Sequence, residues 1–67
     1  MENIQLAQRI RAFRKLKGYT QQQLAEKSGI SLAVLGAIER GNRRPDDQIL
    51  TKISDCLGIP LTELKPE

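Results

Sequence analysis

Only three residues, 28–30, separate two segments that each begin with a helix-start signal. Thr20 and Gln23 have the spacing of a capping box, in which each side chain bonds to the backbone of the other residue. Ser31 belongs to the residue types that cap a helix N-terminus. A connection this short, with a glycine in it, holds two short helices at a steep angle. The sequence therefore predicts two helices joined by a tight turn over about residues 20–40.

Two further helices of similar length and one short helix flank this pair. The residues before Gly18 predict an amphipathic helix, because their apolar side chains recur at a spacing of three or four. These apolar residues are Leu6, Ile10, Phe13 and Leu16. After Pro45, either Asp46 or Asp47 is expected to cap a further helix, where a carboxylate also suits the helix dipole. The residues that this helix should bury are Ile49, Ile53 and Leu57, and a final short helix is predicted within 59–64.

The composition describes one small globular domain over residues 1–67. Lys and Arg number 11 against 8 Asp and Glu, and the formal net charge of +3 mildly favours a polyanionic partner. With one cysteine, Cys56, and no histidine, the chain lacks the usual zinc-ligand sets. We therefore expect no metal, no cofactor and a reducing, cytoplasmic location, with Cys56 at the edge of the core. No apolar run approaches the roughly 20 residues of a membrane-spanning helix, so we expect no membrane insertion.

The letters T-Q-Q-Q-L-A-E-K-S-G-I-S over residues 20–31 are followed by I-E-R-G at 38–41 and by Arg44-Pro45. In combination these motifs resemble the helix-turn-helix domains of the Cro and phage-repressor family, and the resemblance extends over about residues 6–64. It implies an all-α, compact five-helix fold of the lambda-repressor type. It also implies a bacterial or phage transcriptional regulator, usually a repressor, that binds double-stranded operator DNA as a homodimer with its third helix in the major groove.

The resemblance assigns contacts with the DNA phosphates to two places. One is the start of the second helix, at Thr20 and Gln21, where free N–H groups and the helix dipole attract an anion. The other is the loop after the third helix, which consists of Asn42, Arg43 and Arg44. The alternative for both places is ordinary solvation of a helix start and of a basic loop. The resemblance also pairs Arg14 with Glu39, as a structural ion pair between the first and third helices.

The resemblance assigns the groove-facing positions of the third helix to Ser31, Leu32, Ala33, Gly36, Ala37 and Arg40. Between Ser31 and Arg40 these positions carry only small or apolar residues, whereas many relatives have polar side chains there. At about 100° per residue, Ala33, Gly36, Ala37 and Arg40 share the face opposite to Leu35 and Ile38. Gly36 weakens a helix by roughly 1 kcal/mol relative to alanine, so either the helix tolerates this cost or the glycine allows another surface to approach closely.

Two hypotheses follow from this small face. In the first, it enters the major groove, where its methyl groups contact thymine methyls and DNA shape adds discrimination. In the second, a helix from a partner protein or from another copy packs on it, and the domain is an interaction or assembly module. The basic loop and the helix start at Gln21 favour the first hypothesis, because they provide the salt-dependent phosphate anchoring that a DNA complex needs.

An enzyme is the function class that the sequence supports least. The chain has no histidine, no nucleophile elbow and no phosphate-cradling glycine loop. Ser31 is explained by its capping position and needs no role as a nucleophile.

A dimer on DNA needs a contact surface between the two copies. The candidate is the apolar stretch after the fourth helix, because a closed two-fold contact buries the same patch on both copies. Its residues are Ile59, Pro60, Leu61 and Leu64.

Overall fold

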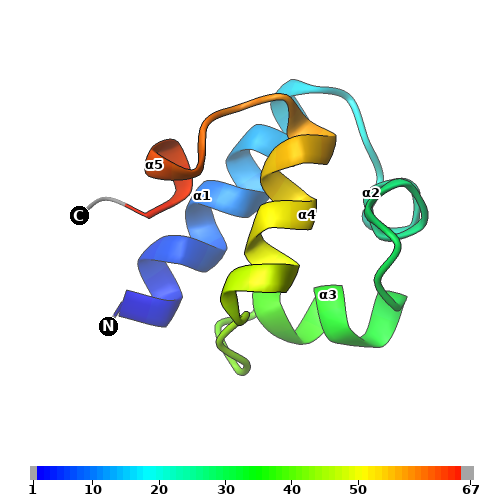
Figure 1. Cartoon of the computed structure of the whole chain (residues 1–67). Helices are drawn as coiled ribbons and strands as arrows, with labels where there is room; N and C mark the ends of the chain where they lie inside the picture. The colour runs from blue at the N-terminus through cyan, green and yellow to red at the C-terminus, as the bar shows by residue number, and fades with distance from the viewer. Residues whose placement is uncertain (1, 66–67) are drawn as a thin grey trace.

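The structure, a computed structural model, describes residues 2–65, so the predicted domain limits of 1–67 extend slightly beyond it. Five helices make up the described chain (Figure 1): α1 (Glu2–Leu16), α2 (Gln21–Ser28), α3 (Leu32–Glu39), α4 (Asp47–Leu57) and α5 (Leu61–Leu64). No β-strand occurs over these residues, and the predicted all-α, five-helix fold class is confirmed. Within the same range, no helix combines the length and apolar character that crossing a membrane requires.

Local hydrogen bonds determine where α2 and α3 begin. The Thr20 hydroxyl accepts a bond from the N–H of Gln23 at 3.0 Å, and the Gln23 side chain accepts one from the Thr20 N–H at 2.9 Å. The predicted capping box is therefore present. The Ser31 hydroxyl accepts a bond from the N–H of Val34 at 3.0 Å and caps α3. Between the helices Gly29 has a φ of +76°, which other residues rarely adopt, and this allows the short turn.

The long helices α1 and α4 follow the sequence prediction with two exceptions. On α4, Ile49 is only partly buried, whereas Leu50, which the sequence did not predict, is buried. Asp46 caps α4, since its side chain accepts a bond from the N–H of Ile49 at 2.8 Å. Leu16, predicted on the buried face of α1, is instead 77% exposed. At about 100° per residue Leu16 lies about 120° around the helix from the fully buried Ile10, which is too far to share its face. Each step of three residues, from Ile10 to Phe13 and from Phe13 to Leu16, turns by about 60° away from the previous position. After two such steps, Leu16 no longer faces the core.

The core lies among all five helices. α1 packs against α3 and α5, α2 packs against α3 and α4, and α4 packs against α5. Figure 1 shows α4 in front of α1, with α2 and α5 on opposite sides of the molecule. Every helix contributes buried side chains to one cluster: Ile10, Leu24, Ala25, Leu35, Ile38, Leu50, Ile53, Leu57 and Leu64. This packing supports the inner side of α3 and leaves Leu32 and Ala33 exposed on its outer side.

Candidate nucleic-acid interface

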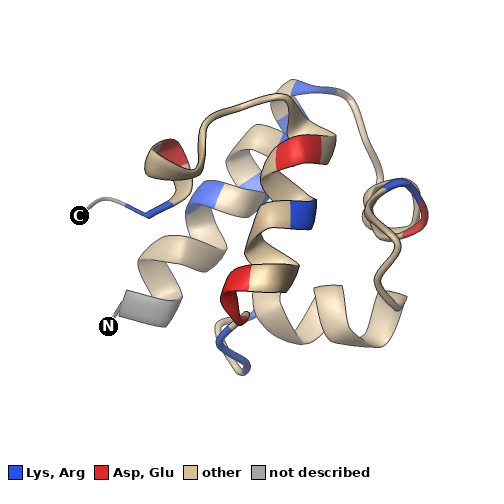
Figure 2. Ribbon diagram, viewed as in Figure 1, with Lys and Arg blue, Asp and Glu red and all other residues tan. Residues whose placement is uncertain are grey.

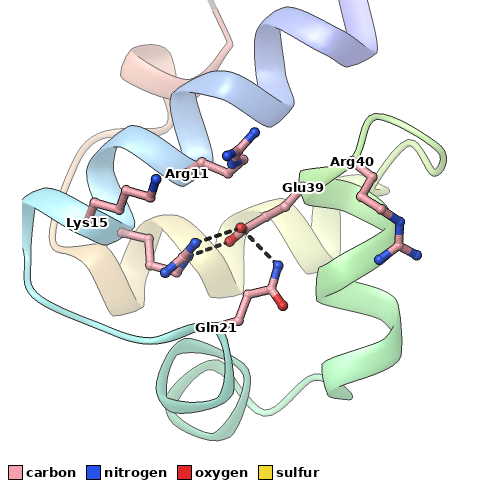
Figure 3. Close-up of a pocket in the computed structure, with 6 residues that line it drawn as sticks. Arg11, Lys15, Gln21, Glu39 and Arg40 are labelled. Atoms are coloured by element: carbon pink, nitrogen blue, oxygen red, sulfur yellow. Dashed lines mark hydrogen bonds and ion pairs between the residues drawn. The ribbon is translucent and has the colours of Figure 1, made fainter.

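An open hollow of about 360 Å³ lies where the start of α2 meets the C-terminal parts of α1 and α3 (Figure 3). Three elements that are far apart in the sequence supply its lining residues: Arg11, Arg14, Lys15, Gln21, Glu39 and Arg40. The hollow therefore brings together one predicted phosphate contact, Gln21, and the predicted pair of Arg14 and Glu39. It also contains two basic residues of α1 to which the sequence analysis gave no role.

An ion pair between Arg14 and Glu39 joins α1 to the end of α3. The Arg14 Nε lies 2.8 Å from Glu39 Oε2, and its Nη2 lies 3.0 Å from Oε1, so the pair is bidentate. The two side chains are only 12% and 1% exposed. Arg14 also donates from Nη1 to the Tyr19 carbonyl at 2.9 Å. A charge buried this far needs such partners, because desolvation would otherwise destabilise the fold.

Gln21 is positioned by the same carboxylate. Its side-chain nitrogen donates to Glu39 Oε1 at 3.1 Å, and Figure 3 shows its amide oxygen turned toward α3. The first N–H groups of a helix have no partner within it, and here the capping box engages those of Thr20 and Gln23 but not those of Gln21 and Gln22. The start of α2 can therefore offer backbone donors to an anion, as predicted for a phosphate contact.

Positive charge dominates the hollow. Arg11, Lys15 and Arg40 are exposed, and within residues 2–65 their charged groups make no hydrogen bond or ion pair. Four cationic side chains and one carboxylate leave three positive charges, which equals the formal net charge of the whole chain. The remainder of the chain is thus balanced overall, and the excess positive charge is concentrated at this one place.

Arg11 and Lys15 are the site residues that the sequence analysis missed. They lie four positions apart on α1, with Arg14 between them, so all three side chains share one side of that helix. The spacing could have indicated a basic stripe on α1. It could not have shown that this stripe faces the start of α2, because that depends on how α1 packs against α3.

The outer face of α3 differs in two places from the face that the sequence predicted. Leu32 and Ala33 are exposed, Leu32 by 46%, whereas Ala37 is only partly exposed. Gly36, predicted to face outward, is buried. The reason is the side chain of Arg40, whose Nη1 lies 3.1 Å from the point where a Cβ on Gly36 would stand. The surface that approaches Gly36 closely is thus part of this chain. Figure 2 shows the visible length of α3 without a charged residue, in contrast to α4 beside it.

The other predicted phosphate contacts lie at the surface. Thr20 is exposed, with its hydroxyl engaged in the cap of α2. Asn42, Arg43 and Arg44 are exposed in the loop between α3 and α4. The backbone of this loop is held to α3, since the N–H of Asn42 donates to the Ala37 carbonyl at 2.9 Å.

The predicted dimer contact requires a correction at one residue. Pro60 is exposed, and Ile59 and Leu61 are partly exposed in the connection to α5 and at its start. Leu64 is 0% exposed, because α5 turns its side chain into the core between α1 and α4. Leu64 therefore stabilises the monomer and is not available to a second copy. The remaining three residues lie at α5, on the side of the molecule opposite to α2 (Figure 1).

Cys56 lies away from the hollow, on α4. It is partly buried and packs against the core cluster, as the sequence predicted. Burial raises the pKa of the Cys56 thiol, and the nearby charge of Lys27 offsets this only partly. Since the thiolate is the reactive form, this cysteine has the character of a packing residue.

Proteins of similar sequence and structure are regulators of transcription. The chain is 57% identical over 58 residues to the uncharacterized HTH-type transcriptional regulator YazB of Bacillus subtilis, covering 87% of this chain and 84% of YazB. It is 39% identical over 62 residues to the immunity repressor protein of Bacillus phage phi105, covering 92% of this chain but only 43% of that repressor. The crystal structure of the restriction-modification controller protein C.AhdI from Aeromonas hydrophila matches with a TM-score of 0.90 and 34% identity, covering 92% of this chain and 94% of that one.

A family model gives the same result. The model of the helix-turn-helix family HTH_3 matches residues 10–64, which include α2, the turn, α3 and all six residues that line the hollow. The resemblance to Cro and phage repressors is thereby confirmed. The chain belongs to the HTH_3 helix-turn-helix family, whose members are DNA-binding regulators of transcription and not enzymes.

Proposed function

We propose that the chain represses transcription in the bacterial cytoplasm by binding a two-fold symmetric DNA operator as a homodimer, with α3 in the major groove. The observation that carries this proposal is the concentration of three net positive charges in the hollow beside an exposed apolar face of α3. Positive charge is needed to bind the phosphate backbone, and an apolar helix face can contact the thymine methyls in the major groove.

Phosphate contacts would hold α3 in register. Gln21 and the backbone at the start of α2 face the hollow, where Arg11 and Lys15 add charge from α1. Thr20 borders this site. Beyond the C-terminal end of α3, close in sequence to Glu39 and Arg40 of the hollow, the exposed loop of Asn42, Arg43 and Arg44 would contact a further stretch of backbone. Phosphate contacts from both places would orient α3 in the groove without reading the bases, which is the usual division of roles in such complexes.

Sequence reading would then fall to the outer face of α3. Ser31, Leu32 and Ala33 lie at its exposed start, and Ala37 follows one turn later. Methyl groups at these positions can contact thymine methyls, and a narrow or flexible site would add discrimination through DNA shape. The expected operator is therefore rich in A·T pairs at the positions under Leu32 and Ala33.

Dimerisation would supply the affinity that one small domain lacks. Two copies would place their α3 helices in successive major grooves, roughly 34 Å apart. The proposed contact is formed by Ile59, Pro60 and Leu61, on the side of the molecule opposite to α2. Analytical ultracentrifugation with and without operator DNA tests this: we expect two copies for each operator, and one copy on a saturated single site would overturn the dimer.

A fluorescence-anisotropy titration with duplex DNA at several salt concentrations tests the assignment of α3. Wild type should bind with an affinity that falls steeply with salt. Ala33→Glu should reduce binding at least tenfold, because Ala33 is exposed and a carboxylate there opposes the groove's negative potential. Thr51→Glu is the matched control, since it adds the same charge to an exposed position of α4.

The two variants separate the alternatives. If Ala33→Glu loses DNA binding and Thr51→Glu keeps it, α3 is supported as the DNA-contacting helix. Equal binding by both variants would move the DNA interface to another surface. No binding by wild type even at low salt would refute the proposed function and favour a protein-interaction module that uses the face of α3.

A further inference from the structure

We propose that Arg40 reads a guanine in the major groove, and that Gly36 leaves the space its guanidinium needs along α3. This inference deepens the proposed function and rests on it. The small side chains of α3 by themselves offer only methyl contacts to the bases. Arg40 would add a specific contact with guanine.

The side chain of Arg40 lies back along α3. Its Nη1 is 3.1 Å from the place where a Cβ on Gly36 would stand, one helical turn earlier in the chain. Side chains on a helix lean toward its N-terminus, so a residue at position 40 naturally covers position 36. Figure 3 shows the guanidinium beside the middle of α3, on the other side of the ribbon from Glu39. The absence of a side chain at Gly36 thus leaves room for this guanidinium to lie close against the helix.

Within α3, no other side chain can bond to a base edge. Positions 32–38 carry only apolar residues and glycine. Glu39 is buried, and its two oxygens accept bonds from Arg14 and Gln21. Arg40 follows directly as the C-cap residue; it is exposed, and its side chain makes no hydrogen bond or ion pair among residues 2–65. Together with the hydroxyl of the N-cap residue Ser31, its guanidinium supplies the unengaged side-chain donors along this face of the described helix.

The geometry of a guanidinium selects the base. Its parallel N–H groups match the O6 and N7 acceptors of guanine, which is the commonest specific side-chain contact in the major groove. Ala33 and Ala37, on the same face, suit thymine methyls. Each operator half-site should therefore contain one G·C pair under Arg40, next to thymine-containing pairs. The competing assignment for Arg40 is a phosphate contact, because Arg40 also lines the hollow.

Selection from a randomised duplex library, performed with wild type and with Arg40→Ala, tests the inference. The wild-type motif should contain one guanine in each half-site at which Arg40→Ala loses discrimination, by roughly 5- to 150-fold for a bidentate contact. The other positions of the motif should remain. Lys52→Ala is the charge-matched control, because Lys52 is exposed on α4, and it should leave the motif unchanged.

Gly36→Ala provides a second, independent variant. Its new Cβ would displace the Arg40 guanidinium by a few tenths of an ångström, so discrimination should fall at the same guanine and at no other position. Circular dichroism is expected to show that all variants remain folded.

The outcomes distinguish the inference from the function on which it rests. If wild type selects a motif but Arg40→Ala weakens binding equally for every sequence, Arg40 contacts phosphate and the inference is wrong while the proposed function stands. An unchanged motif and affinity in Arg40→Ala would also refute it. If wild type selects no motif and binds no duplex, the proposed function itself fails, and the inference fails with it.

Discussion

The helices α3 and α4 distribute their polar residues in opposite ways. α4 buries Leu50, Ile53 and Leu57 and exposes its charged residues, so its sequence alone accounts for its orientation. α3 exposes Leu32 and Ala33, while its only charged residue, Glu39, is buried. Exposed apolar residues do little for the stability of the monomer. The proposed contact with DNA would account for the outer face of α3, whereas the core accounts for the orientation of α4.

The largest difference in stability between matched variants of α3 and α4 should appear when the buried carboxylate of Glu39 is neutralised. Glu39→Gln leaves the Arg14 guanidinium, which is 12% exposed, without a charged partner. Breaking a buried ion pair from one side typically destabilises a protein by about 3 kcal/mol or more, and the change should appear as a lower urea midpoint. Asp55→Asn, at an exposed position of α4, should shift stability by no more than about 0.5 kcal/mol. Equal effects of the two variants would show that the pair of Arg14 and Glu39 contributes little.

The next largest difference in stability is expected between two leucine variants, one on α4 and one on α3. Leu50→Ala should lower the free energy of unfolding by about 2–5 kcal/mol, because Leu50 is 2% exposed and its loss leaves a cavity. Leu32→Ala should cost about 1 kcal/mol or less, since Leu32 is 46% exposed in the free protein. Thermal or urea unfolding of the two variants measures both values. A large loss for Leu32→Ala would mean that this residue supports the monomer, and the comparison between the helices would fail.

The smallest expected effect concerns Gly36. Gly36→Ala should raise stability by up to about 1 kcal/mol through helix propensity, because the atom nearest to the new Cβ is the flexible end of Arg40. Ala33→Gly, at an exposed position of the same helix, should lower stability by a similar amount and serves as the reverse control. Both are measured by urea unfolding. Destabilisation by Gly36→Ala would show that the Arg40 guanidinium cannot move from its place over the helix.

Much of the fold was predictable because its signals are local. The capping box of Thr20 and Gln23 and the caps Ser31 and Asp46 bond within three residues of themselves, so the chain needs no tertiary structure to place these helix starts. Boundaries predicted from such caps were correct. The burial of Leu16 was predicted wrongly because a spacing of three residues does not by itself define a face, and only packing shows where a face ends.

The candidate site was predictable only in part. The motif in the sequence led to Gln21, to the loop of Asn42–Arg44 and to the pair of Arg14 and Glu39, and the structure places Gln21 and this pair in one hollow. Arg11 and Lys15 were missed, because a basic stripe on a helix is usually solvated and acquires a role only from what it faces. Leu64 was assigned to the surface because its sequence neighbours are apolar, and the turn of α5 into the core could not be read from them.

Residue order along the chain thus determined the helices, their caps, the tight turn at Gly29 and the family. These depend on contacts over a few residues, which the order itself specifies. Only the tertiary structure decided that the net positive charge gathers between α1, α2 and α3, and that Arg40 covers Gly36. It also decided that Leu64 is buried in the core and cannot contact a second copy. Each of these depends on how helices rotate about their own axes as they pack, and that rotation is set by the whole core at once.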